Sequence, residues 1–144
     1  WLPEGEGTDW CQTEGRTDQC SLKISKESEG PSEWVMDRES EGAWTDRWTP
    51  DVKFRVTGYI KTESVQGRGS CIALRWGVYN YPQRYPFVCS QKLSGDNEWT
   101  KVCVEIDGPP PPEVGAIYII FRQDGSGTSW LDDLEVERIV ASGE

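Results

Sequence analysis

Two adjacent carboxylates, Asp132 and Asp133, are the residues of this sequence that most resemble catalytic or metal-binding groups. They stand in GTSWLDDLEVERI (127–139), a run that alternates like a strand. Because strand side chains alternate between faces, Asp132 is expected to point inward with Trp130 and Leu134, and Asp133 toward solvent. Diverging neighbours cannot flank one glycosidic bond, which argues against a catalytic dyad. An inward carboxylate needs a partner, either loop N–H groups or a calcium ion.

Composition excludes several classes of function. The chain of 144 residues has 15 Lys and Arg against 25 Asp and Glu, a net charge of −10, and no histidine. The acidic balance argues against nucleic-acid binding, and the lack of histidine excludes serine-histidine catalysis. No apolar run is long enough to span a membrane, and no Cys-x-x-Cys spacing indicates zinc. We expect one monomeric domain, residues 1–139, followed by the start of a linker at 140–144.

Five cysteines in a chain rich in Trp, Gly and Pro indicate an oxidising compartment, so we expect a secreted protein. Cys11 and Cys20 flank a polar loop that a disulfide would close. Cys71 and Cys89 lie at the outer ends of two strand-like runs that would pair as a hairpin, which predicts a second bridge. Cys103 is then either a free thiol or replaces Cys71 as the partner of Cys89.

Alternation at period two recurs along the chain, and no helical stripe is sustained, which is typical of an all-β protein. Gly, Pro, Asp and Asn separate the alternating runs. Such a series favours an antiparallel β-sandwich, such as a jelly roll. The expected strands are residues 20–25, 32–39, 51–63, 70–80, 85–93, 98–107, 115–123 and 129–139.

Three segments resemble, in their order and spacing, the β-jelly-roll carbohydrate-binding modules of the galactose-binding-like type: FRVTGYIKT, LSGDNEWTKVCVEIDGP and AIYIIFRQDGSGTSWLDDLEV. Such modules accompany xylanases, glucanases and other polysaccharide-degrading enzymes. The resemblance covers about 120 residues, from TDQCSLKIS onward. It implies a jelly roll that binds a polysaccharide and is attached to a catalytic domain.

The same resemblance implies a structural calcium ion at one edge of the sandwich. Its ligands would be Asp132 and the loop 17–20, which contains Asp18. The family's Asn-Gly-Gly-Phe-Glu opening, whose Glu is a frequent ligand, is missing; WLPEGEGTDW stands there instead. The hydrogen-bonding alternative for Asp132 therefore stays open.

Tyrosines and arginines recur on the outward faces of three expected strands. Aromatic rings lie under the C–H faces of sugars, and planar polar side chains bond their hydroxyls in pairs. If the strands share a sheet, as the resemblance implies, these residues form one concave patch rimmed by tryptophans. The candidates are Arg55, Tyr59, Lys61, Arg75, Tyr79, Tyr118 and Arg122, with Trp34, Trp44 and Trp48 at the rim.

The favoured interpretation is a non-catalytic, secreted module that tethers an enzyme to a polysaccharide. One alternative is a domain that packs against a neighbouring module and has no glycan affinity. Another, a small polysaccharide-cleaving enzyme, is disfavoured by the lack of histidine and of a convergent carboxylate pair. The sequence leaves both neutral and acidic polysaccharides open, because an acidic ligand would need cations gathered at the contact to offset the net charge.

Overall fold

The computed structural model describes residues 2–17, 20–39, 52–77, 86–107 and 116–140. Every regular element in these residues is a β-strand, which confirms the all-β prediction. No helix among them is long and apolar enough to cross a membrane. The strands are β1 (Leu2–Glu4), β2 (Thr8–Cys11), β3 (Ser21–Lys26), β4 (Pro31–Glu39), β5 (Val52–Gly77), β6 (Val88–Cys89), β7 (Leu93–Asp107), β8 (Ala116–Asp124) and β9 (Gly127–Val140).

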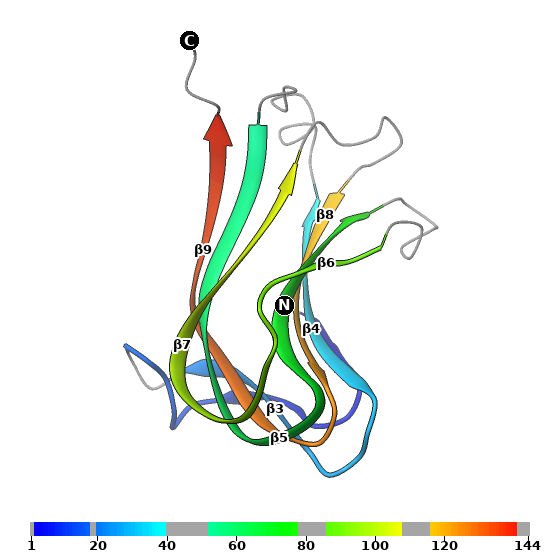
Figure 1. The fold of residues 1–144 in the computed structure, drawn as a ribbon, viewed down its shortest axis with the longest axis vertical. Coiled ribbons are helices and arrows are strands. Elements are labelled where there is room, and N and C mark those ends of the chain that lie inside the picture. The colour runs from blue at the N-terminus through cyan, green and yellow to red at the C-terminus, as the bar shows by residue number, and fades with distance from the viewer. Residues whose placement is uncertain (1, 18–19, 40–51, 78–85, 108–115, 141–144) are drawn as a thin grey trace.

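The 26-residue strand β5 organises the sheet. Its first half pairs with β7 and β9, and its second half with β8 and β6, all antiparallel. Between the halves, Ser64, Gly67 and Gly69 have positive φ, and the register with β7 shifts, so the strand bends. The bend folds the sheet, of order β1-β4-β8-β5-β9-β3-β2, into two facing layers (Figure 1).

The core lies between the two layers. One layer contains β2, β3, β9, β7 and the first half of β5; the other contains β1, β4, β8, β6 and the second half of β5. Removing a fully buried ring, as in Phe54→Ala, would cost about 3–5 kcal/mol. This arrangement is the predicted antiparallel β-sandwich of jelly-roll type. Both halves of β5 contribute side chains to the core, namely Phe54, Val56, Ile60, Ile72 and Leu74.

Strand boundaries differ from the prediction at the bend and at the edges. The segments 51–63 and 70–80 were predicted as separate strands, but β5 runs through the polar, Gly-rich stretch between them. Of the described residues 86–93 of the predicted strand 85–93, only β6 and the first residue of β7 are extended. Strands β1 and β2 were not predicted; they are short and lie at the two ends of the pairing order.

Candidate ligand-binding site

The two layers separate the predicted ligand residues into two groups. Arg75, Tyr118 and Arg122 point away from the core on the layer that contains β8; this surface is called the β8 face below. The outward side chains of the other layer, among them Arg55, Tyr59 and Lys61, form the β9 face. The prediction of one concave patch was therefore wrong, because β5 passes from one layer to the other between Lys61 and Arg75.

On the β8 face, aromatic rings and guanidinium groups lie together. Arg75 and Tyr118 are cross-strand partners on β5 and β8. The Cζ atom of Arg75 lies 4.5 Å from the ring centroid of Phe87 and 5.7 Å from that of Tyr118. The Cζ atom of Arg122 lies 5.1 Å from the Phe87 ring, so this ring contacts both guanidinium groups.

A glycine makes room for the Tyr118 ring on this face. A Cβ atom added at Gly77 would lie 2.7 Å from Cε2 and 2.9 Å from Cζ of Tyr118. The ring therefore occupies the space in which a side chain at position 77 would stand. Beside it, Ala73 and Ile120 are cross-strand partners and fully buried, so small and apolar residues form the floor of the face.

A depression of about 550 Å³ opens on the β8 face. Arg122 is held there by Glu33, and its NH2 atom lies 3.8 Å from Asp124 Oδ2. The Nε atom of Arg75 is buried and has no hydrogen-bond partner. The depression thus combines an apolar ring, a paired cation and a cation without a hydrogen-bond partner for its Nε. Its lining residues are Glu4, Gly5, Pro31, Glu33, Arg75, Pro86, Phe87 and Arg122.

Sequence reasoning missed Phe87 as a site residue. It precedes β6 (Val88–Cys89), in which Cys89 is the cross-strand partner of Ala73. Continuing the alternation by two residues puts Phe87 on the face of Arg75, which is two residues beyond Ala73. The aromatic residue in a polar segment was the available signal in the sequence. The pairing of β6 with β5, which places Phe87 beside Arg75, is known only from the structure.

On the β9 face, the charged candidates are engaged by the protein itself. Arg55 Nε donates to Glu105 Oε1 at 2.9 Å, and Lys61 Nζ lies 2.7 Å from Glu14 Oε1. Hydrogen bonding to Glu14 raises the pKa of Lys61, and the Arg55 guanidinium lowers the pKa of Glu105. These contacts leave the cations of this face less available to a ligand.

The Tyr59 ring of the β9 face is covered as well. The Cζ atom of Arg16 lies 3.5 Å from its centroid. A second depression, of about 430 Å³, lies beside it, with Lys101, Thr57 and Glu135 among its lining residues. Arg16 thus takes the position over the ring that a sugar would need.

A β-bulge in β9 sets the orientation of the two aspartates. Thr57 is the partner of Glu135 but Tyr59 is the partner of Asp132, so β9 carries one extra residue there, and Asp133 has a φ of 52°. The bulge reverses the alternation, so that Leu131 lies in the core and Asp132 points outward. The prediction that Asp132 faces inward was therefore wrong.

Trp130 follows the same reversal. It was predicted to face the core with Asp132, but it is buried on the outer side of β9, between Lys23 and Lys61 on the neighbouring strands. Their Nζ atoms lie 5.7 Å and 5.4 Å from its ring. Leu134 and Val136, beyond the bulge, do pack against the core as predicted.

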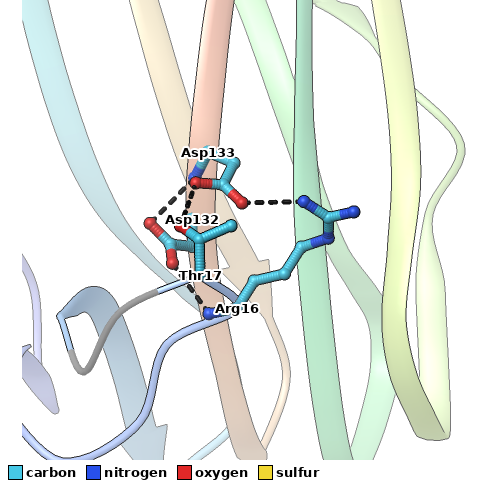
Figure 2. A network of polar contacts seen from close by, with 4 residues as sticks. All are labelled: Arg16, Thr17, Asp132 and Asp133. Atoms are coloured by element: carbon cyan, nitrogen blue, oxygen red, sulfur yellow. Dashed lines mark hydrogen bonds and ion pairs between the residues drawn. The ribbon is translucent and has the colours of Figure 1, made fainter.

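The aspartates hold the loop before β3, an arrangement called the Arg16 clasp below (Figure 2). The backbone N–H of Arg16 donates to Asp132 Oδ2 at 2.8 Å, and that of Asp133 donates to Asp132 Oδ1 at 2.8 Å. Arg16 NH1 and Thr17 Oγ1 donate to the two oxygens of Asp133, at 2.9 and 2.8 Å. The hydrogen bond from the Arg16 guanidinium lowers the pKa of Asp133.

The calcium prediction remains untested, because Asp18 lies outside the described residues. Among the residues that the structure does describe, no group of three His, Cys, Asp or Glu side chains could hold a metal ion. Both oxygens of Asp132 already accept N–H groups, whose dipoles point their positive ends at the carboxylate. This donor set fits hydrogen bonding better than cation coordination.

The tryptophans predicted for the rim do not line the described depression. Trp34 is a core residue with 8% of its surface exposed, and its Nε1 donates to Lys23 O at 3.1 Å. Its position on β4 opposite Phe121, which is also in the core, explains why it points inward. Trp44, Trp48 and Tyr79 lie outside the described residues.

The predicted disulfides are not formed in the structure. Cys11 is the cross-strand partner of Ser21, so Cys20, one residue earlier, is expected to point to the other face. Cys89 is the partner of Ala73 rather than of Cys71. Burial, with the charge and hydrogen bond of the neighbouring Cys89, raises the pKa of Cys71 to about 12. The prediction thus correctly placed Cys71 and Cys89 on paired strands, but they are not directly opposite each other.

Comparison with known proteins shows the fold. No family model and no curated protein matches the sequence. The CBM22-1 xylan-binding domain of Paenibacillus barcinonensis Xyn10C is 15% identical, with a TM-score of 0.66, over 99% of this chain and 87% of that one. The module TmCBM61, solved with β-1,4-galactotriose, is 18% identical, with a TM-score of 0.59, over 96% and 88%.

A third similar structure shows that this fold does not identify a function. A cyclase from Fischerella sp. TAU is 14% identical, with a TM-score of 0.60, over 97% of this chain and 74% of that one. The chain therefore has the fold of carbohydrate-binding modules, as the resemblance implied. Because a cyclase shares that fold, the function has to be argued from the surface residues.

Proposed function

We propose that this chain is a non-catalytic carbohydrate-binding module, and that its ligand lies in the depression of the β8 face. The supporting observation is that Arg75, Phe87 and Arg122 line that depression, with the Tyr118 ring beside Arg75. Aromatic rings can pack against the C–H faces of a sugar, and guanidinium groups can bond its hydroxyls in pairs. Similar structures include a xylan-binding domain and a module bound to a galactotriose.

The role that we propose for the module is to hold an appended polysaccharide-degrading enzyme at its substrate, outside the cell. Tethering converts the encounter of enzyme and polymer into an intramolecular one with a raised effective concentration. Fusion to a soluble hydrolase should then increase hydrolysis of an insoluble polymer and leave hydrolysis of a short soluble oligosaccharide unchanged. An equal effect on both substrates would argue against targeting.

The alternative of a purely structural or protein-interaction domain predicts an exposed apolar patch. Within the described part of the chain, the exposed large apolar side chains are Trp10 on β2 and Val88 on β6. These two residues lie on different layers of the sandwich. The described surface therefore gives this alternative no support.

Gel retardation on a panel of neutral and acidic polysaccharides tests the binding role. We expect wild-type protein to be retarded by at least one polymer. Tyr118→Ala should lose at least tenfold in affinity, while Tyr59→Ala, which removes the same side chain from the β9 face, should keep it. Equal loss by both variants, or loss by Tyr59→Ala alone, would move the site off the β8 face. Absence of retardation by every polymer would contradict carbohydrate binding and favour the structural alternative.

A further inference from the structure

Arg75 differs from the other arginines described above and from Lys61. Arg55, Lys61 and Arg16 lie 2.7–2.9 Å from a carboxylate of the protein, and Arg122 is bonded to Glu33. Among the described residues, Arg75 makes no ion pair, and its buried Nε has no hydrogen-bond partner. Its described contacts are with the rings of Phe87 and Tyr118.

These rings do not replace a hydrogen-bond acceptor. An arginine carries five N–H donors, and a donor that is buried without a partner destabilises the folded state. The ring faces attract the positive charge, which offsets part of this cost, but they accept only weak hydrogen bonds. The guanidinium of Arg75 is therefore positioned and partly desolvated; because its Nε is buried, a ligand in the depression would bond its terminal nitrogens.

The charges around the depression indicate the type of acceptor. Glu33 is compensated by Arg122, and Glu4 is exposed, where water and salt screen it. Arg75 is thus the uncompensated charge among the half-buried groups that line the depression. A carboxylate bonds a guanidinium bidentately and neutralises it, whereas a neutral hydroxyl leaves the charge uncompensated.

We propose that the ligand is an acidic polysaccharide and that Arg75 binds the carboxylate of one uronate residue. The inference rests on the proposed function, because it concerns the same depression. The net charge of −10 repels a polyanion at long range. Binding of an acidic polysaccharide therefore needs an unpaired cation at the contact, and Arg75 provides one.

Carboxyl reduction provides a matched pair of ligands. Polygalacturonate, alginate and glucuronoxylan would each be compared with its carboxyl-reduced form, in which the uronates become neutral sugars on an unchanged backbone. For at least one polymer, we expect the acidic form to bind wild-type protein at least tenfold more tightly, and the preference to weaken several-fold as salt rises from 20 to 500 mM.

Variants locate that preference. Arg75→Gln should abolish the preference for the acidic polymer. Arg75→Lys should keep part of that preference, because the charge remains without the planar guanidinium. Arg55→Gln, on the β9 face, should keep all of it. Thermal melts check that each variant is folded. If Arg75→Gln does not fold, a partial loss of the acidic preference in Arg75→Lys tests the proposal instead.

Three results would overturn the acidic-ligand proposal. Equal binding of the acidic and reduced polymers would show a neutral ligand and leave the carbohydrate-binding function intact. A preference for the acidic polymer that persists in both Arg75 variants would place the carboxylate at another cation. Absence of binding to all six polymers and to the neutral panel would remove the proposed function as well.

Discussion

The β8 face and the β9 face carry the same kinds of residue, but they differ in whether every arginine described is paired with a carboxylate. Each has arginines and a tyrosine, but on the β9 face the arginines are paired with Asp133 and Glu105, and Arg16 covers the Tyr59 ring. On the β8 face, Arg75 has ring contacts and no carboxylate among the described residues. The comparison teaches that residue type identifies a candidate surface, but the pairing of its charges distinguishes a binding surface from a structural one.

The largest expected effect comes from one substitution made in each half of β5. Gly77→Ala places a Cβ atom 2.7 Å from the Tyr118 ring, which must leave its present position beside Arg75. We expect at least a tenfold loss of affinity for the polysaccharide, about 1.4 kcal/mol, because the displaced ring can no longer contact the ligand. The folded state should be little affected, since a side chain at the surface can move.

Gly58→Ala is the matched control, because its Cβ would meet core atoms instead, at 2.9 Å from Ile72 Cδ1 and 3.1 Å from Leu131 Cδ1. Overpacking of this kind costs about 1–3 kcal/mol of stability. Binding titrations and thermal melts on both variants separate the two effects. Lost affinity in the folded Gly58→Ala protein, or full affinity in Gly77→Ala, would contradict the assignment of the β8 face as the binding surface.

Breaking the Arg16 clasp should affect stability and leave binding unchanged. Arg16→Gln removes an ion pair with Asp133 and a contact with the Tyr59 ring, together worth about 1 kcal/mol at this exposure, or roughly 2–4 °C in Tm. Arg55→Gln, on the same face, should lower Tm less, because Arg55 has no ring contact described. The polysaccharide affinity of Arg16→Gln should equal that of wild type. A tenfold fall would contradict the structural role of this face.

The clasp should also weaken in acid. The pKa of Asp133 is lowered in the folded state from an ordinary value of 3.8, so its contribution is present above that pH and is lost as the pH falls through the folded-state pKa. Asp133→Asn, which tolerates the positive φ, should melt about 2 °C below wild type at pH 7. That gap should close below pH 3.8. A gap that stays constant across this range would mean that the Asp133 charge does not stabilise the fold.

The smallest expected effect is that of a chelator. Because Asp132 is used by N–H groups, we expect EDTA to leave Tm unchanged, in wild type and in Asp132→Ala alike. Bound calcium predicts a different result: stabilisation by mass action, a fall of Tm in EDTA, and loss of that sensitivity in Asp132→Ala. The latter pattern would establish the metal site that the family resemblance implies.

Local alternation was sufficient to predict the fold class and much of the core. Ile72, Leu74, Ile119 and Phe121 are buried where the period of two placed them. It also selected Arg75, Tyr118 and Arg122 as outward residues, and these lie together. Such predictions succeed wherever a strand is regular, because the side-chain period is then a property of the sequence itself.

Predictions failed where the backbone departs from a regular strand. The bulge at Asp133 inverted the faces of Trp130 and Asp132, and no residue of LDDLE marks an extra residue in the strand. The bend of β5 separated Tyr59 from Arg75, although each was correctly predicted to point outward. The role of Phe87 and the pairing of Cys71 with Cys89 depended on the register of β6, which arises from pairing between separate segments.

The membership of β5 in both layers has a consequence for how the chain folds. Neither layer can form without this strand, so the layers should not melt separately, and unfolding should be a single cooperative transition. Strands β8 and β9 are partners of β5 that are far from it along the chain, as in the pair Val52 and Val140. Closing such long loops before any pairing is gained makes folding slow, in the range of milliseconds to seconds.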